Sequence, residues 1–278
     1  MKNLREKMLQ VMQQKNFSER TIKTYLYCVR ELAKFYNKSP DLLTVKQVND
    51  YLHYMIMQKH VSKSLVNQTI SAFKLLTVNV LRRKWKSLDF PRPKREKYLP
   101  TVLSTEEVAR IIRATINVKH KTLIMLTYSA GLRISEVINL KLTDINSDRM
   151  QINIRQGKGH KDRRIMLSEA VLLQLRTYWK TYRPMIYLFE GYRNGTPYST
   201  RSAQELFQRS VTLAKIKRHV TFHTLRHSFA THLVESGVDV VVIQRLLGHS
   251  NLHTTSVYLH LQNYDINNIR SPFDDLVL

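Results

Sequence analysis

The chain has 278 residues, of which 45 are Lys or Arg and 21 are Asp or Glu, so its formal net charge at pH 7 is +24. Hydrophobic residues make up 43% of it, which argues against a wholly disordered protein. No apolar run approaches the roughly 20 residues that span a bilayer, and no charged-then-apolar leader opens the sequence, so we expect neither a membrane protein nor a secreted one.

The single cysteine and the excess of basic residues further restrict the compartment and the kind of partner that we expect for this protein. Cys28 alone allows no internal disulfide and no four-cysteine zinc site, and it fits a reducing cytoplasm. The large positive charge indicates a polyanionic partner, most often nucleic acid. A generally basic protein without such a partner is the alternative.

Residues 1–81 predict a small bundle of helices. Ser18 is a candidate N-cap for a helix through Tyr36, because apolar residues recur there at three- and four-residue steps. Thr44 is the candidate cap of a second helix, and a third is expected over residues 64–81. Neither Pro nor Gly interrupts these three segments.

Residues 82–97 predict a basic linker between this bundle and a second domain at 98–278. The segment holds eight basic and two acidic residues, and Pro91 and Pro93 oppose a continued helix. A solvated linker is the simplest interpretation of such a charge run. Because it joins two basic domains, we favour a linker that lies along DNA phosphates, with these residues as DNA-binding candidates: Arg82, Arg83 and Lys84.

The second domain predicts helices around a small β-hairpin. Ser104 and Glu107 have the spacing of a capping box. Strands are expected at 150–155 and 164–167, joined by the glycine-containing loop 156–162. Further helices are expected at 121–129, from 134 onward, at 168–182, 202–214, 224–236 and 240–247, and through Tyr258.

Six residues stand out as candidates for chemistry on a phosphodiester. Arg133 follows a glycine break, and His223 and Arg226 lie three residues apart, on one face of a helix. Each residue alone has an ordinary structural explanation, such as a salt bridge or core packing. The combination is far more specific: Arg133, Lys158, His223, Arg226, His249 and Tyr258.

The motifs that contain these residues resemble those of the tyrosine recombinases of the phage-integrase and Xer type. They occur in that family's order over residues 99–260, and residues 18–25 resemble its core-binding domain. The resemblance implies a mainly α protein with a small β-hairpin, in which a SAM-like helical domain and a catalytic domain clamp DNA. The motifs are Gly131-Leu-Arg-Ile-Ser-Glu136, Gln156-Gly-Lys-Gly-His-Lys-Asp-Arg163, His223-Thr-Leu-Arg-His-Ser-Phe-Ala-Thr-His232, Leu246-Leu-Gly-His-Ser250 and Thr254-Thr-Ser-Val-Tyr258.

The resemblance also implies a chemical role for the nucleophile and the arginines. Tyr258 would attack a DNA phosphate and leave a 3′-phosphotyrosyl link with a free 5′-hydroxyl. Arg133 and Arg226 would bind the non-bridging oxygens, where their fork-shaped donors match the developing charge. Glu136, three residues from Arg133, would orient its guanidinium, although a purely structural salt bridge is an equal alternative.

The remaining candidates would move protons or bind the phosphate. By the same resemblance, His223 would accept a proton or a hydrogen bond near the nucleophile, and His249 would donate to the phosphate. Lys158 would protonate the departing 5′-oxygen from its glycine-flanked loop. We expect no cofactor and no metal, and a zinc site built from His223, His227 and His232 is disfavoured because the zincin glutamate is absent.

The resemblance implies a site-specific recombinase of a mobile genetic element or of the short Xer type. It would bind specific sites in double-stranded DNA and act as a homotetramer on paired sites, without a membrane and with accessory proteins unidentified. The apolar and acidic segment 271–278 would dock on a neighbouring protomer or fray. Two alternatives stay open: a catalytically silent DNA-binding or architectural protein, and a DNA-relaxing enzyme like the type IB topoisomerases.

Overall fold

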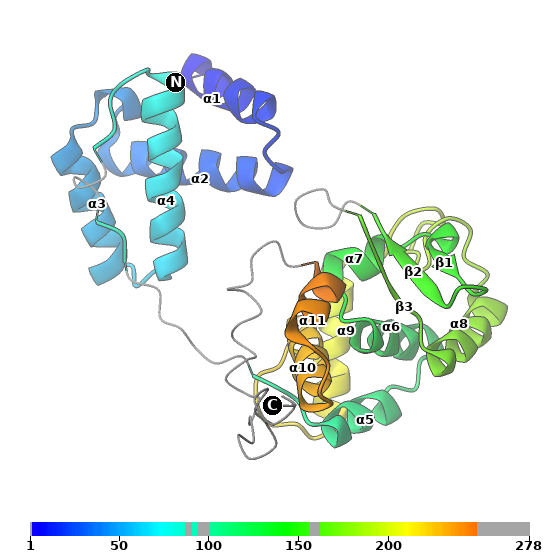
Figure 1. The fold of residues 1–278 in the computed structure, drawn as a ribbon. Coiled ribbons are helices and arrows are strands. Elements are labelled where there is room, and N and C mark those ends of the chain that lie inside the picture. Colours follow the sequence, from blue (N-terminus) through cyan, green and yellow to red (C-terminus); the bar gives the residue numbers. More distant parts are fainter. Residues whose placement is uncertain (1, 87–90, 94–100, 156–161, 249–278) are drawn as a thin grey trace, which may run out of the picture. The chain divides into compact units, whose positions relative to one another are not determined.

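The computed structural model describes residues 2–86, 91–93, 101–155 and 162–248. The chain divides into two compact units, Met1–Tyr98 and Leu99–Leu278, here called the N-terminal and C-terminal units. The secondary structure of the described residues is mainly helical, with one small antiparallel sheet (Figure 1), so the predicted fold class is confirmed. No helix among them is long and apolar enough to cross a membrane.

The N-terminal unit is all-helical in its described part, and side chains cap its helices. Ser18 accepts a hydrogen bond from the Thr21 N–H, and Thr44 forms a capping box with Gln47, so both predicted caps are confirmed. Ser62 caps the helix that was expected from residue 64. The helices are α1 (Lys2–Gln14), α2 (Glu19–Tyr36), α3 (Val45–Met57) and α4 (Lys63–Leu75), with a 3-10 helix at Pro40–Leu42 and a π-helical turn at Leu76–Val80.

Helix α1 completes the core of this unit, although the sequence gives no cap for it. Met8 and Met12 of α1 are almost fully buried, as are Leu32 of α2 and Ile70 of α4. These side chains belong to one apolar cluster that all four helices share. The unit therefore has a core of its own, as expected for a bundle that folds independently.

The described part of the basic segment 82–97 lies against the helices of the N-terminal unit. Trp85 packs edge-on against Phe73 of α4, with ring centroids 6.2 Å apart. The Arg83 guanidinium donates to the Asp41 carbonyl oxygen at 2.7 Å, and Arg92 donates to the Asn67 carbonyl oxygen at 3.2 Å. Part of the expected linker is therefore attached to this unit by its own basic side chains.

The C-terminal unit contains a three-stranded antiparallel sheet, β1-β2-β3 (Figure 1). Ile152 of β2 pairs with Ile165 of β3, and both side chains are buried, so one face of the hairpin joins the core. Met150 was expected to begin a strand, but its backbone is left-handed (φ +49°), which starts the strand one residue later. The strands are β1 (Ile145–Asn146), β2 (Gln151–Ile154) and β3 (Arg163–Met166).

Helix α6 lies at the centre of this unit and packs against α8, α9 and α10. It begins three residues before the expected start because the Asn117 side chain accepts from the His120 N–H. Helix α10 also begins earlier, which places His223 in its first turn. The helices are α5 (Thr105–Ala114), α6 (Val118–Ser129), α7 (Ile134–Asn139), α8 (Glu169–Tyr182), α9 (Thr200–Leu213), α10 (Phe222–Glu235) and α11 (Val240–Leu247), with a 3-10 helix at Leu142–Asp144.

A buried hydrogen bond that fixes the chain entering α5 gives a stability prediction. The Leu103 N–H donates to the Ser228 hydroxyl of α10 at 2.8 Å, and both residues are fully buried. Ser228→Ala would leave this N–H without its acceptor, so we expect a loss of about 1–3 kcal/mol in the free energy of unfolding. The stability of the C-terminal unit is measured by urea unfolding in a Trp85→Phe background, where Trp179 is the one remaining tryptophan and its fluorescence reports on this unit.

Ser236→Ala is the matched control. Its hydroxyl donates to the His232 carbonyl oxygen at an exposed helix end, so removal should cost less than about 0.5 kcal/mol. Equal losses in the two variants would contradict the assigned role of Ser228.

Candidate active site

Arg133 is held at the start of α7 by a glycine turn and by a carboxylate. Gly131 has a left-handed backbone (φ +56°), and a Cβ there would lie 2.4 Å from Phe229, so only glycine fits. Two residues later, the Arg133 N–H donates to Glu136 at 2.9 Å, and its guanidinium donates to the same carboxylate at 2.7 Å. Glu136 therefore fixes both the backbone and the side chain of Arg133.

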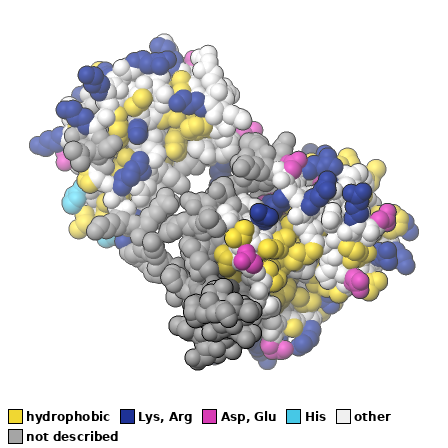
Figure 2. Space-filling model, in the orientation of Figure 1, with side chains coloured by type: hydrophobic (Ala, Val, Ile, Leu, Met, Phe, Trp, Pro, Cys, Tyr) yellow, Lys and Arg dark blue, Asp and Glu magenta, His cyan; other side chains and the backbone are white. Residues whose placement is uncertain are grey.

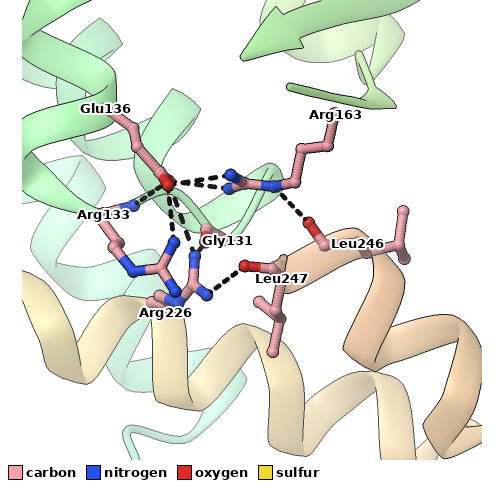
Figure 3. Close-up of polar contacts among 7 residues, drawn as sticks. All are labelled: Gly131, Arg133, Glu136, Arg163, Arg226, Leu246 and Leu247. Carbon is pink, nitrogen blue, oxygen red and sulfur yellow. Dashed lines mark hydrogen bonds and ion pairs between the residues drawn. The ribbon is translucent and has the colours of Figure 1, made fainter. Parts of the chain in front are cut away.

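Glu136 is the centre of a cluster of three arginines (Figure 3). Besides Arg133, the two terminal nitrogens of Arg163 donate to its two oxygens at 2.9 and 2.8 Å, and Arg226 lies 3.7 Å away. The Glu136 side chain is only 6% exposed. Burial alone would raise the pKa of its carboxyl, but the hydrogen bonds and charges of Arg163 and Arg133 lower it to about 2.

Arg226 enters the cluster from α10 and is almost completely buried. Its guanidinium donates to the Gly131 carbonyl oxygen at 2.7 Å and to the Leu247 carbonyl oxygen at 2.5 Å. Arg226 thereby links the chain after α6 to the end of α11 (Figure 3). With three guanidinium groups around one carboxylate, the cluster keeps a surplus of positive charge that suits an anion.

Two histidines lie beside this cluster on α10. The rings of His223 and His227 are 4.5 Å apart. Burial, followed by the charges of Arg226 and Arg133, lowers the pKa of His223, and burial and the charge of His223 lower the pKa of His227 to about 4. Both imidazoles are therefore mainly neutral at pH 7, which is the form that accepts a proton.

The structure brings three of the six predicted residues together: Arg133, His223 and Arg226. Lys158, His249 and Tyr258 lie outside the described residues. The expected contact between Glu136 and the Arg133 guanidinium is present, at 2.7 Å. Of the three histidines weighed for zinc, His232 instead lies 2.8 Å from the Tyr128 hydroxyl. Among the residues described, no group of three or more His, Cys, Asp and Glu side chains could hold a metal ion.

Sequence reasoning missed Arg163 as a member of the site. Its side chain is 9% exposed, and it also donates from Nε to the Leu246 carbonyl oxygen at 2.9 Å. A signal was present, because Arg163 ends the hairpin motif that contains Lys158. Its partner Glu136 lies 27 residues earlier, so the pairing follows from the tertiary fold and not from local spacing.

Comparison with protein families identifies the chain. The model of the phage integrase family matches residues 101–264, and that of the phage integrase N-terminal SAM-like domain matches residues 4–87. The chain belongs to the phage integrase family. It is a tyrosine recombinase, and tyrosine recombinases are DNA strand-transferring enzymes of site-specific recombination.

Curated relatives and solved structures agree with this assignment. An integrase/recombinase of Sinorhizobium fredii is 39% identical over 98% of this chain and 88% of its own length. Tyrosine recombinase XerA of Pyrococcus horikoshii is 35% identical over 87% of this chain and 83% of its own. Nothing in these comparisons favours the non-catalytic or topoisomerase alternatives.

Two solved structures show the same fold. A crystal structure of XerA recombinase aligns with a TM-score of 0.57 at 29% identity, over 97% of this chain and 99% of that one. A lambda integrase dimer bound to a COC′ core site aligns with a TM-score of 0.73, over 91% and 96% of the two chains. At 16% identity, the second likeness concerns the fold alone.

The low pKa of Glu136 predicts how stability changes with acid in this tyrosine recombinase. The pKa falls from an ordinary 4.5 to about 2 in the folded protein, so the carboxylate stabilises the fold by about 3 kcal/mol above pH 4.5. That contribution is lost as the pH falls from 4.5 to 2. We expect Glu136→Gln to unfold about 3 kcal/mol more easily than wild type at pH 7, and the difference to shrink below pH 4.5. Urea unfolding at pH 7, 4.5 and 3 measures this.

Glu106→Gln is the control for loss of a carboxylate. Glu106 forms an ion pair with Arg113 at 3.2 Å in which both side chains are more than two-thirds exposed, so its removal should cost less than about 1 kcal/mol. If the difference in free energy of unfolding between Glu136→Gln and wild type stays constant between pH 4.5 and 3, that difference does not come from the carboxylate charge.

Proposed function

We propose that this tyrosine recombinase breaks and rejoins double-stranded DNA at specific sites through a 3′-phosphotyrosyl intermediate, with Tyr258 as the nucleophile. The observation that carries the proposal is the buried cluster of Arg133, Arg163 and Arg226 around the single carboxylate of Glu136. Three fixed cations against one anion attract a phosphate before any charge develops in the reaction. Stabilisation by preorganised donors of this kind is usually the largest single contribution to enzyme catalysis.

In this proposal, Arg133 and Arg226 bind the non-bridging oxygens of the scissile phosphate. Their positions support this role, because the carboxylate and two backbone carbonyl oxygens hold both guanidinium groups without help from a substrate. Little reorganisation is then needed at the moment of reaction. His223 is neutral and accepts a proton or hydrogen bond near the nucleophile, and His249 donates to the phosphate.

The chemistry proceeds by exchange at phosphorus. The Tyr258 oxygen forms a bond to phosphorus, the bond to the 5′-oxygen breaks, and Lys158 gives that oxygen its proton. The phosphotyrosyl link retains the energy of the broken bond, so attack by a 5′-hydroxyl rejoins the strand without a nucleotide cofactor.

We propose that duplex DNA is the partner and that both units contact it. The net charge of +24 supports this, and Figure 2 shows Lys and Arg side chains on the surfaces of both units. Similar solved structures include XerH bound to a difH substrate and lambda integrase bound to a core site. We assign residues 1–81 as the core-binding domain, 82–97 as the linker and 98–278 as the catalytic domain of a clamp.

Assembly and linker contacts are further parts of the proposal. Four protomers would act on two paired sites, in the cytoplasm, where the DNA of a mobile element or chromosome is accessible. Arg82 and Lys84 are exposed and would contact phosphates. Arg83 donates to the Asp41 carbonyl oxygen, so its contribution to DNA binding would need this bond to exchange.

Replacement of the nucleophile tests the reaction. Tyr258→Phe should retain DNA binding but form no covalent adduct, because the attacking oxygen is gone while the ring remains. The substrate is a nicked duplex built from genomic fragments selected by binding, and denaturing gels detect the adduct. Tyr192→Phe, at a fully exposed tyrosine, is the control and should form the adduct normally. An adduct from Tyr258→Phe would assign the nucleophile to another residue.

A sulfur-bridged substrate tests the proton donor. Lys158→Ala should slow cleavage of ordinary DNA by about 10²–10⁴-fold, the usual contribution of acid catalysis. Sulfur in place of the 5′-bridging oxygen makes a thiolate the leaving group, with a reference thiol pKa of about 8.5, so much less proton assistance is needed.

The two variants of the site should therefore respond differently to sulfur. Lys158→Ala should recover most of its cleavage rate, whereas Arg133→Ala, which loses a phosphate contact, should not. If sulfur fails to rescue Lys158→Ala, the lysine binds the phosphate or DNA, and another group supplies the proton.

A further inference from the structure

Arg163 is the residue that joins the lysine hairpin to the arginine cluster. It is the first residue of β3, five positions after Lys158. All three of its side-chain nitrogens are used: the terminal pair bind both oxygens of Glu136, and Nε binds the Leu246 carbonyl oxygen (Figure 3). One side chain thus holds together β3, α7 and the end of α11.

On this basis we propose that Arg163 is a positioning residue for the proton donor. It fixes the base of the hairpin that carries Lys158 against the Arg133 and Arg226 pair, so that the ammonium reaches the leaving oxygen. This inference rests on the proposed function, in which Lys158 protonates the 5′-oxygen.

The two ends of the hairpin are anchored with different strength. At the β2 end, Arg155 makes a single contact with Asp144 at 2.7 Å; Asp144 is 4% exposed, but the Arg155 side chain is 61% exposed. At the β3 end, Arg163 is 9% exposed and makes a bidentate pair with a carboxylate that is itself 6% exposed. A single contact from a guanidinium that is open to water fixes geometry less firmly than a buried bidentate pair. Arg163 is therefore the firmer of these two anchors.

Gly248 lies so close to the Arg163 side chain that a larger residue would collide with it. Its backbone is left-handed (φ +61°), and a Cβ added there would lie 2.9 Å from Arg163 Cδ and 3.2 Å from its Nε. Gly248, at the end of α11, therefore lies against the Arg163 side chain. Gly237 has a similar backbone (φ +80°), but a Cβ there meets nothing within 4 Å.

The two phosphate-binding arginines have other partners. Arg133 makes two bonds of its own to Glu136, and Arg226 donates to the carbonyl oxygens of Gly131 and Leu247; none of these bonds involves Arg163. What Arg163 adds is the connection of the hairpin to this cluster. Its loss should therefore impair proton donation more than phosphate binding.

The experiment measures cleavage of ordinary and sulfur-bridged DNA by Arg163→Lys. A lysine keeps the charge but cannot bind both carboxylate oxygens and the Leu246 carbonyl oxygen together. We expect DNA binding within about 3-fold of wild type and ordinary cleavage slower by about 10- to 100-fold, the effect of a misplaced catalytic group. Cleavage of the sulfur-bridged substrate should be close to the wild-type rate.

Arg164→Lys is the matched control, since it makes the same substitution at the exposed neighbour on β3. It should cleave both substrates as wild type does. Equal slowing of Arg163→Lys on both substrates would overturn the inference, because the defect would then lie in phosphate binding or in the fold.

Lys158→Ala, measured in parallel, separates this inference from the proposed function. If sulfur rescues Lys158→Ala but not Arg163→Lys, only the positioning role fails. If sulfur rescues neither variant, the proton-donor role of Lys158 fails and the inference fails with it.

A second pair of variants covers the case in which Arg163→Lys does not fold. Gly248→Ala displaces Arg163 by contact with its side chain, whereas Gly237→Ala imposes a similar backbone strain in open space. Gly248→Ala should show slow cleavage that sulfur restores, and Gly237→Ala should cleave normally. The same sulfur-independent slowing in both alanine variants would contradict the positioning role.

Discussion

The buried carboxylate of Glu136 is the constraint on which the arginine centre depends. A buried charge is costly unless it is paired, and Glu136 is paired with Arg133 and Arg163 by hydrogen bonds and with Arg226 at 3.7 Å. These partners come from α7, β3 and α10, so the pairing sets how the three elements meet. Because the cations outnumber the anion, the same pairing leaves the cluster with a surplus of positive charge, which suits the phosphate proposed above.

The ends of two helices supply the rest of the negative charge that Arg226 needs. The chain turns after α6 at Gly131 (φ +56°) and after α11 at Gly248 (φ +61°). At these turns the carbonyl oxygens of Gly131 and Leu247 accept from the Arg226 guanidinium. Carbonyl groups at helix C-termini carry partial negative charge and are not used inside the helix. A cation can therefore be buried at this point without a carboxylate of its own.

Local features of the fold could be predicted from the sequence, and tertiary ones could not. The caps at Ser18, Thr44 and Ser104 depend on side chains that bond within three residues, so their patterns are visible in the sequence. Strand β1 has two residues and exists only because β2 pairs with it. The role of Arg163 depends on partners 27 and 83 residues away, and one of these is a backbone carbonyl, which carries no sequence signal.

The arginine cluster also lowers the pKa of His223, which bears on its proposed role as a base. Burial and the charges of Arg226 and Arg133 lower the pKa of His223, so the imidazole is mainly neutral and less basic than a free histidine. The proposed phosphate brings a negative charge to those same guanidinium groups and offsets their effect on the imidazole. The pKa of His223 would then rise towards its ordinary value when DNA binds. In the proposed mechanism, proton acceptance by His223 would then be coupled to occupation of the phosphate site, because both would depend on the charge of the two arginines.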